Sequence, residues 1–460
     1  MTVRPSFGLA IVGLGASLAP LDIAVNVALP AITAHFRLAM GDVQWIVICY
    51  VLVYGSLMLV CGKLGDLFGH RLIFRIGLVV SAVGCAACAA APDWPLFLAA
   101  RAAQGVGTAL AISCTTALAV SLYPPGRRLR ALAAFSMIVS LAAAVGPFLG
   151  GVLVELWGWP AVYWVRVPIA LLTLALSGLL PSPPADARPF DFTGGILVAA
   201  AMSAFLLALV MVQRPEVSVW LALAVFVVSL ALTQWYVRRS HRIEEPIIRP
   251  SLFADPAFVV PNVMNMLASL AAFAILLLTP YYLMNVLKLS TFLSGLVLAV
   301  AFVAALAGAP LAAWLVPRIG RRPTAFCGVV LVGLALLPHG FTGATTPVAV
   351  VGLLLALQAL GMGLLAVAYT DLVVDTLAEH DRGVAGSLVL LTRTIGNVSG
   401  ASVLSALYAY GASGLGGTEG FLAGYRFAFV AAGGGLLVAL LLSCAVPRAW
   451  FGRSVAPARS

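Results

Sequence analysis

The chain alternates between long apolar runs and short polar segments. There are fourteen apolar runs of roughly 19 to 28 residues, enough for a helix rising about 1.5 Å per residue to cross a hydrocarbon core of about 30 Å. These runs lie at about 7–30, 44–62, 72–91, 95–122, 130–154, 160–180, 192–213, 218–236, 258–284, 293–316, 323–341, 346–373, 383–410 and 424–446. In lipid each backbone N–H and C=O group must be paired within its own segment, so such runs predict helices. We therefore expect an all-α membrane protein with fourteen transmembrane helices, the first a retained helix rather than a signal sequence.

The composition supports this class. Hydrophobic residues make up 62% of the 460 residues and charged residues only 9%, whereas soluble domains carry about 25% charged residues. All seven cysteines lie in or at the ends of apolar runs, which is typical of small buried apolar residues rather than of disulfides or metal sites. They are Cys49, Cys61, Cys85, Cys88, Cys114, Cys327 and Cys444. The five histidines show no metal-binding spacing.

The net charge of +10 could suggest nucleic-acid binding, but the placement of the basic residues argues against it. Of the 26 lysines and arginines, 19 fall in loops that would share one side of the membrane and only 3 in loops on the other. Basic residues concentrate on the cytoplasmic side of membrane proteins. With an even number of helices, this predicts that both termini are cytoplasmic.

Two polar stretches, 181–192 and 238–256, bracket the seventh and eighth runs. They divide the chain into an N-terminal six-helix bundle (1–180), a linker with two extra transmembrane helices (181–256) and a C-terminal six-helix bundle (257–460). A faint repeat supports two related halves, because both Gly62–Arg71 and Ala313–Arg322 end in Gly-x-Arg after corresponding helices. Repeated halves with a substrate site near the midplane are common in transporters.

Asp22 lies within the first run, about 12 Å below its outer end. A carboxylate at such depth costs roughly 2.5–3.5 kcal/mol, so we expect it to face a cavity, a partner or both. Arg101 lies at a similar depth in the fourth run and could contact Asp22 if the two helices are neighbours. Loss of water disfavours a charged carboxyl group and a nearby guanidinium favours it, and the sequence does not decide which effect wins. A structural ion pair remains an alternative to a proton-coupling role.

The segment Gly62–Arg71 combines Gly62, Asp66, Gly69 and Arg71 within ten residues. Glycines allow close helix approach and tight turns. Asp66 can cap the next helix or pair with an arginine on another helix. This composition favours a latch for one conformation, with an ordinary loop as the alternative.

Other polar and helix-breaking positions lie within or near the runs. Proline and glycines that allow close packing occur late in the fifth run, at Gly146, Pro147, Gly150 and Gly151. Arg393 lies deep in the thirteenth run, where it could line a cavity. Glu155 and Arg166 lie near outer helix ends, where interfacial positions are expected.

Four of these segments together resemble the major facilitator superfamily, and in particular its fourteen-span drug:proton antiporter branch. The segment from Leu21 to Pro30, with Asp22 and Asn26, is similar to the branch's first-helix motif LDxTIVNVALP. The segment Gly62–Arg71 resembles the superfamily's loop motif, and Gly146–Gly151 the fifth-helix motif associated with exporters. Arg101 and Gln104 match the fourth-helix motif, and the resemblance implies that this arginine takes part in proton coupling.

Some positions depart from these patterns. Leu67 and His70 replace the usual basic residue of the loop motif, and Ala142 replaces a glycine of the fifth-helix motif. In the branch's WRWxFxINxP segment, Pro160 stands in place of Arg and Arg166 in place of Asn. An extra positive charge here would disfavour dicationic substrates.

The resemblance implies a major facilitator fold and a multidrug antiporter, not an enzyme, that exports lipophilic and cationic small molecules from the cytoplasm in exchange for protons. The chain lacks the nucleotide-binding pattern GxxxxGK[ST], so we expect no cofactor and a proton gradient as the energy source. Expected partners are the substrate, protons and membrane lipids, with no nucleic acid; we expect a monomer in the cytoplasmic (inner) membrane. A metabolite exporter or an uptake symporter of the same fold is the main alternative, and a non-transporting membrane receptor is a more distant one.

Overall fold

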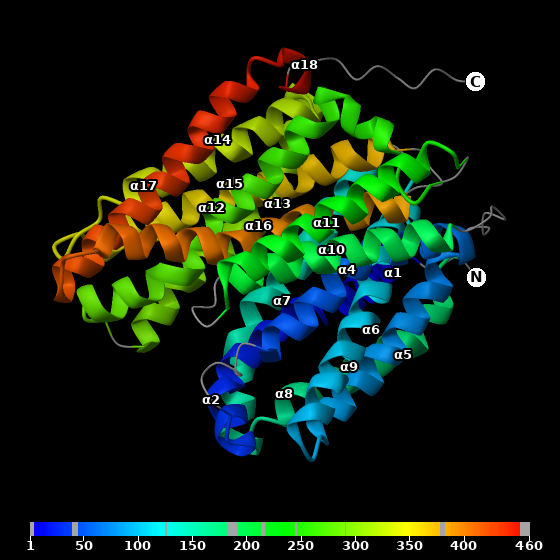
Figure 1. Ribbon diagram of the computed structural model, residues 1–460, viewed down its shortest axis with the longest axis horizontal. Coiled ribbons are helices and arrows are strands. Elements are labelled where there is room, and N and C mark those ends of the chain that lie inside the picture. Colours follow the sequence, from blue (N-terminus) through cyan, green and yellow to red (C-terminus); the bar gives the residue numbers. More distant parts are fainter. Residues whose placement is uncertain are drawn as a thin grey trace. The chain divides into compact units, whose positions relative to one another are not determined.

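The computed structural model describes residues 4–38, 45–124, 127–181, 191–212, 217–243, 246–289, 291–377 and 382–450, and helices dominate this part of the chain (Figure 1). Thirteen helices among the described residues are long and apolar enough to cross a membrane, which confirms an all-α membrane fold. The remaining expected span coincides with α16 (Arg382–Ala412), which has 31 residues. Polar residues such as Arg393 and Asn397 lie within α16, which is not among those thirteen helices, so the count of fourteen stays a prediction.

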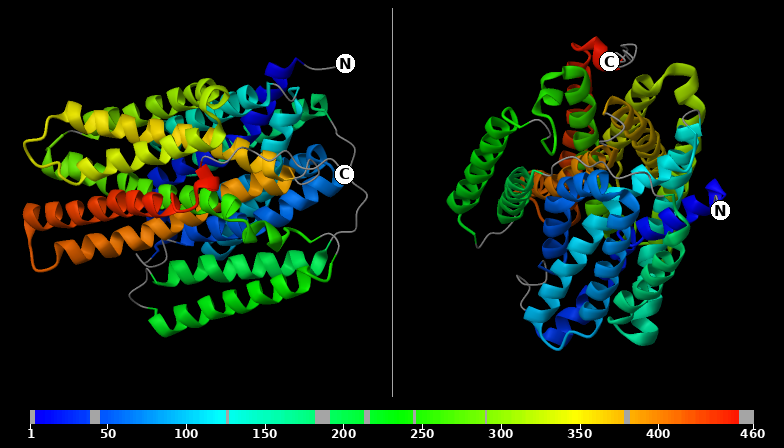
Figure 2. Two further views of the ribbon diagram at one scale, coloured as in Figure 1. Left: turned by 90° about the horizontal axis from the view of Figure 1, so that it is seen from above. Right: turned by 90° about the vertical axis from the view of Figure 1, so that its right-hand side faces the viewer.

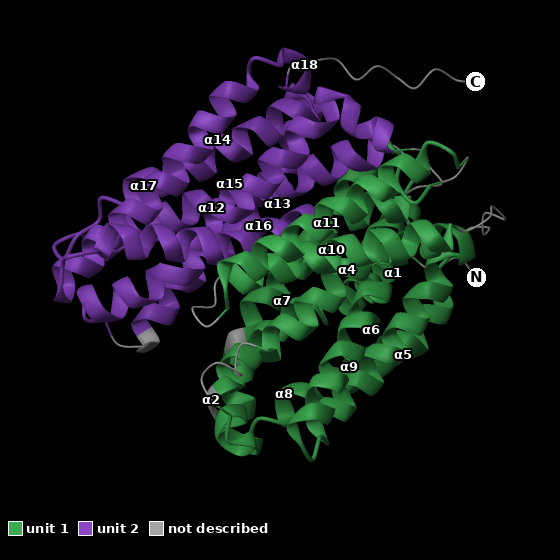
Figure 3. Cartoon of the chain, in the orientation of Figure 1, with its two compact units in different colours: residues 1–249, 377–391 green, residues 250–376, 392–460 purple. Residues whose placement is uncertain are grey.

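Contacts between helices divide the chain into two units (Figure 3). The first unit contains residues 1–249 and 377–391, and the second contains 250–376 and 392–460. The helix α16 therefore contributes its first turns to the first unit and the rest to the second. The division into two bundles and a separate linker stays a prediction.

The first unit begins with an interrupted membrane span. Its helices are α1 (Pro5–Ala16), the 3₁₀ turn η1 (Pro20–Ile23), α2 (Ala24–Phe36), α4 (Trp45–Phe68), α5 (His70–Ala89), α6 (Trp94–Ser121), α7 (Arg128–Trp157), α8 (Ala161–Trp164), α9 (Arg166–Leu176), η3 (Ser177–Leu179), α10 (Phe192–Val212) and α11 (Val219–Ser240). The last two lie side by side (Figure 2), and α10 also packs on α4.

Asp22 lies in the break between α1 and α2, whereas the sequence predicted a single helix over 7–30. The α-helix stops at Ala16, and Pro20, which has no N–H group, begins the 3₁₀ turn that contains Asp22. The Asp22 N–H donates to the Ala19 carbonyl at 3.0 Å. Irregular backbone at membrane depth is tolerated where surrounding protein buries it or where it lines an aqueous cavity. The Asp22 side chain thus projects from a 3₁₀ turn rather than from the face of a regular α-helix.

Two close backbone contacts position the helices around this break. A Cβ atom on Gly84 of α5 would lie 2.7 Å from the Gln104 nitrogen of α6. On α7, a Cβ atom on Gly150 would lie 2.9 Å from the Cα atom of Ala24, the first residue of α2. Both separations are too short for any side chain larger than hydrogen without a backbone shift. Glycine at these points lets α6 and α7 approach their neighbours closely.

The second unit contains the remaining helices. They are η4 (Pro250–Ala254), α12 (Pro256–Tyr281), the π-helical turn η5 (Tyr282–Val286), α13 (Thr291–Ile319), α14 (Arg321–His339), α15 (Val348–Thr376), the later part of α16, α17 (Gly417–Ser443) and α18 (Pro447–Trp450).

The same kind of connection between two helices occurs once in each unit. Gly69 alone links α4 to α5 with φ of +93°, and Gly320 alone links α13 to α14 with φ of +96°. Glycine adopts positive φ without the steric cost that other residues incur. These are the equivalent glycines of the repeat seen in the sequence, so the two segments share backbone geometry as well as residue pattern.

Candidate functional site: a buried ion cluster around Asp22

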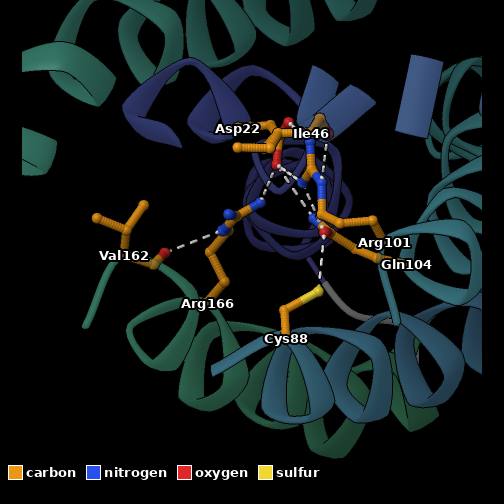
Figure 4. Close-up of polar contacts among 7 residues, drawn as sticks. All are labelled: Asp22, Ile46, Cys88, Arg101, Gln104, Val162 and Arg166. Carbon is orange, nitrogen blue, oxygen red and sulfur yellow. Dashed lines mark hydrogen bonds and ion pairs between the residues drawn. The ribbon is translucent and has the colours of Figure 1, made fainter. Parts of the chain in front are cut away.

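Three side chains from two other spans converge on the Asp22 carboxylate (Figure 4). Arg101 donates from Nη1 to Oδ1 at 2.9 Å and from Nη2 to Oδ2 at 3.0 Å. Arg166 donates from Nη1 to Oδ1 at 2.5 Å, and Gln104 donates from Nε2 to the same oxygen at 3.1 Å. The carboxylate therefore accepts four hydrogen bonds, three of them from guanidinium groups. We call Asp22, Arg101, Gln104 and Arg166 the Asp22 cluster.

Arg101 is held from several directions at once. Besides its two bonds to Asp22, it donates from Nε to the Ile46 carbonyl at 2.8 Å and from Nη1 to Gln104 Oε1 at 2.8 Å. Gln104 is three residues further along α6, on the same helix face. The Arg101 side chain is fully buried. Contact between Asp22 and Arg101 was expected only if their helices were neighbours, and the structure places them together.

The prediction that Arg166 lies at the membrane interface is wrong. Its side chain is 1% exposed and pairs with Asp22, while its Nε atom donates to the Val162 carbonyl at 3.2 Å. Arg166 lies deeper in its span than the sequence suggested. It is five residues beyond the start of α8, and Arg101 is seven residues beyond the start of α6. Both arginines can thus lie about 8 to 10 Å inside their spans. The Arg166 Nη2 atom is buried and has no hydrogen-bond partner among the described residues.

Two tyrosines flank the guanidinium groups. The ring of Tyr50 lies 4.6 Å from Arg101 Cζ, and the ring of Tyr163 lies 5.0 Å from Arg166 Cζ. Aromatic faces attract guanidinium ions, more strongly where water is excluded. Neither tyrosine was predicted as a site residue, because single aromatic residues in an apolar run carry no recognisable signal.

The cluster has an excess of positive charge. With Asp22 ionised, two guanidinium groups and one carboxylate sum to +1. Buried ions are expensive unless they are paired and hydrogen-bonded. Each side-chain nitrogen of Arg101 donates to at least one acceptor, whereas Nη2 of Arg166 has no acceptor among the described residues.

Two of the other predicted site residues lie outside the cluster. Asn26 is exposed on α2, one turn beyond Asp22. Arg393 is exposed on α16 in the second unit, and its place in a cavity stays a prediction.

The loop motif forms mostly helix, since α4 continues through Phe68. Asp66 does not cap α5; its carboxylate instead accepts from the backbone N–H groups of Gly383 and Val384 at 2.8 and 3.2 Å, in the first turn of α16. Helix N-termini carry unpaired N–H groups and partial positive charge, so a carboxylate is favourable there. All of these residues belong to the first unit.

The neighbouring motif residues support this contact. A Cβ atom on Gly62 would lie 2.6 Å from the Gly383 carbonyl oxygen, so the glycine is needed for close approach. His70 Nε2 lies 3.2 Å from Asp66 Oδ1. Arg71 donates to the Leu180 carbonyl at 3.0 Å, at the end of η3. The motif thus ties together four segments of the first unit, although its role as a latch stays a prediction.

The fifth-helix motif packs against the segment that contains Asp22. Besides the contact of Gly150 with Ala24, a Cβ atom on Gly146 would lie 3.5 Å from the Pro20 carbonyl oxygen. Gly151 faces open space, and the side chain of Pro147 lies outside the described part of the structure. Movement of α7 would therefore act directly on the Asp22 turn.

The second unit contains a buried polar network that the sequence did not indicate. Tyr369 on α15 donates to Asn262 Oδ1 at 2.7 Å, and Asn262 donates to the Phe258 carbonyl at 2.7 Å. Asn265 donates to Thr392 Oγ1 at 3.0 Å, and that oxygen lies 3.3 Å from the Tyr369 hydroxyl. We call Asn262, Asn265, Tyr369 and Thr392 the Tyr369 network.

Within the described residues, no group of three or more histidine, cysteine, aspartate or glutamate side chains could hold a metal ion. The groups present at this site form ion pairs, and Asp22 is the one acid among the four side chains of the Asp22 cluster.

Comparison with known proteins identifies the family. A family model described as Major Facilitator Superfamily matches residues 6–238 and 262–459. The Multidrug resistance protein Stp of Mycobacterium tuberculosis (strain CDC 1551 / Oshkosh) is 30% identical over 408 residues, covering 86% of this chain and 74% of that protein. The Riboflavin transporter RibZ of Clostridioides difficile (strain 630) is 26% identical over 410 residues, covering 87% of this chain and 88% of that protein.

A solved structure shares the fold. The human organic anion transporter MFSD10 (TETRAN) has a TM-score of 0.69 at 17% identity, covering 96% of this chain and all of that one. At this identity the likeness shows the fold alone. The family match confirms the resemblance found in the four sequence motifs, and the chain belongs to the Major Facilitator Superfamily.

Proposed function

We propose that this protein exports lipophilic small molecules across the cytoplasmic membrane by alternating access, in exchange for protons. The name of the relative Stp supports multidrug export, and the four motifs support the antiporter branch. In this proposal both termini are cytoplasmic and the protein works as a monomer.

The observation on which the proposal rests is the Asp22 cluster. An ionisable residue inside a membrane span is costly and is typical of proton relays and ion pathways. The Asp22 side chain is 11% exposed, so it is less enclosed than either arginine. Asp22 is the acid in the cluster and therefore the group that would accept the proton.

Protonation would change the balance of forces within the cluster. A neutral carboxyl group loses its ionic attraction to Arg101 and Arg166, and the cluster charge rises from +1 to +2. The two guanidinium groups would then repel each other more strongly than before. The 3₁₀ turn, α6 and α9 are the elements this change would drive toward a second arrangement.

The expectation of a cationic cargo assumed an Asp22 carboxylate free to bind it. In this structure both carboxylate oxygens already accept hydrogen bonds from arginine. The proposed export is therefore proton-coupled and does not require a cationic cargo.

The test is proton-driven transport in inside-out membrane vesicles, using fluorescent lipophilic compounds and riboflavin as a panel. Asp22→Asn removes the proton-accepting group at nearly constant shape. We expect uptake driven by an imposed pH gradient to fall at least about tenfold, with the protein still present in the membrane. Asp93→Asn is the matched control, because Asp93 caps α6 through the Leu96 N–H group and asparagine caps as well. Transport that is equal in Asp22→Asn and wild-type vesicles would remove Asp22 from the mechanism.

The alternative is uptake or export of a metabolite, favoured by the name of the relative RibZ. The same vesicles distinguish these possibilities. Riboflavin moving with the proton rather than against it would indicate a symporter.

A further inference from the structure

The two arginines of the Asp22 cluster differ in how completely they are paired. Arg101 uses Nε, Nη1 and Nη2, and each of these nitrogens donates to at least one acceptor. Arg166 uses Nε and Nη1, but its Nη2 is buried without a partner among the described residues. The cluster therefore lacks one acceptor at Arg166.

The acceptors that the two arginines and Gln104 contact are already engaged, and the Tyr163 hydroxyl, which has no hydrogen-bond partner among the described residues, does not accept a hydrogen bond from Nη2. Both Asp22 oxygens, Gln104 Oε1 and the Val162 carbonyl oxygen accept the bonds described above. Tyr163 presents its ring to Arg166, which stabilises a cation but does not replace a hydrogen-bond acceptor. The missing partner is therefore not a neighbouring group in its present position.

The excess positive charge of the cluster limits the chemical class to which an acceptor for Nη2 can belong. A neutral carbonyl group could accept one bond from Nη2, but it would leave the excess charge of +1 in place. A cation would increase that charge. A monoanion satisfies Nη2 and brings the total to zero, with two guanidinium groups facing two negative groups. Arginine binds carboxylates with short, charge-assisted hydrogen bonds.

We propose that the Asp22 cluster binds the carboxylate of an organic anion, with Arg166 as the residue that recognises it. This deepens the proposed function, on which it rests, by naming the chemical class of the cargo. Asp22 keeps its own position on Arg101, and the cargo carboxylate takes the second negative position beside it. Tyr50 and Tyr163, both buried, place aromatic rings next to the guanidinium groups.

The proposal also bears on the driving force. An anion that leaves a cell with a negative interior moves with the membrane potential, which contributes about 2.3 kcal/mol per charge at 100 mV. Protonation of Asp22 raises the cluster charge to +2 and by itself strengthens anion binding, so exchange of the anion for a proton requires the second arrangement of the 3₁₀ turn, α6 and α9 to release the cargo. Such an exchange would use the potential as well as the pH gradient. A one-for-one exchange of a monocation for a proton would use the pH gradient alone.

The experiment measures binding to the purified full-length protein in detergent, with no transport required. The probes are benzoate, benzamide and benzamidine, which have similar size and carry charges of about −1, 0 and +1 at neutral pH. Thermal unfolding is followed by tryptophan fluorescence at increasing probe concentration. We expect benzoate to raise the unfolding temperature and the other two probes to leave it unchanged.

Variants locate the site. Arg166→Gln is expected to weaken benzoate binding about tenfold or more, as one charge-assisted hydrogen bond is lost. The matched control Arg426→Gln removes an exposed guanidinium from α17 and should bind benzoate as wild type does. Arg166→Lys keeps the charge but not the planar fork, and it should also bind more weakly. It serves as the test variant if Arg166→Gln does not purify as a single species.

Three outcomes would overturn the proposal. They are an equal response to benzoate and benzamide, benzoate affinity unchanged in both Arg166 variants, and a response to chloride that benzoate does not exceed. The last would assign the site to an inorganic anion. Because the vesicle assay measures proton-driven transport independently, either result can fail while the other stands.

Discussion

The Asp22 cluster and the Tyr369 network are both buried polar groups within membrane spans, yet they are built differently. The Tyr369 network is neutral, and hydrogen bonds connect its tyrosine, asparagines and threonine to one another and to backbone. The Asp22 cluster is charged, contains an acid on an irregular turn and leaves one donor without a partner. A neutral hydrogen-bonded network holds helices together, whereas a charged cluster can respond to protons and ligands. In the proposed function, this difference favours a coupling role for the Asp22 cluster and structural support for the Tyr369 network.

The largest expected effect on stability within this comparison comes from Arg101. Replacing it with glutamine leaves Asp22 Oδ2 without its arginine partner and leaves the Ile46 carbonyl without its side-chain donor. Breaking a buried ion pair by removing one partner costs about 3–5 kcal/mol. We expect Arg101→Gln to lower the unfolding free energy by that order, measured by denaturant unfolding in detergent.

Arg166→Gln is the matched comparison. It removes one charged hydrogen bond but also the excess buried charge, so we expect a change within about 1 kcal/mol. Equal destabilisation by the two substitutions would show that the arginines are equivalent, contrary to the division of roles drawn here.

Smaller effects are expected from two tyrosine hydroxyl groups. Tyr369→Phe leaves Asn262 Oδ1 without its donor, which should cost about 1–3 kcal/mol. Tyr163→Phe removes a buried hydroxyl that has no hydrogen-bond partner among the described residues, so it should change stability little. Thermal unfolding of the two variants side by side checks the contrast. If Tyr163→Phe is the more damaging change, the Asp22 cluster depends on a polar contact that this structure does not show.

The all-helical architecture was predictable because backbone groups in lipid must form hydrogen bonds within their own segment. The positions of most spans follow from the lengths of the apolar runs. Asp22 and Arg101 were recognisable as partners from their similar depths. The break in the first span was not predicted, since Pro20 is tolerated both within and between membrane helices. The sequence predicted Arg166 at the interface because the residue lies near the outer end of the apolar run 160–180. The one sign of a different role was that Arg166 stands in place of the asparagine of the WRWxFxINxP segment.

Contacts that join distant segments were beyond the sequence. Asp66 could cap any helix whose first turn approached it, and nothing in its neighbourhood indicated α16. The Tyr369 network combines residues from three helices whose spacing shows no motif. Such features depend on which helices pack together, and a single sequence does not specify that pairing.

The central claim is that Asp22 takes up and releases a proton. Infrared difference spectroscopy on the reconstituted protein tests this directly, because a protonated carboxyl group has a carbonyl stretch separate from that of a carboxylate. The account predicts a protonated-carboxyl band that appears on acidification within the pH range of the transport assay and is missing from Asp22→Asn. A wild-type spectrum identical to that of Asp22→Asn across this range would contradict it.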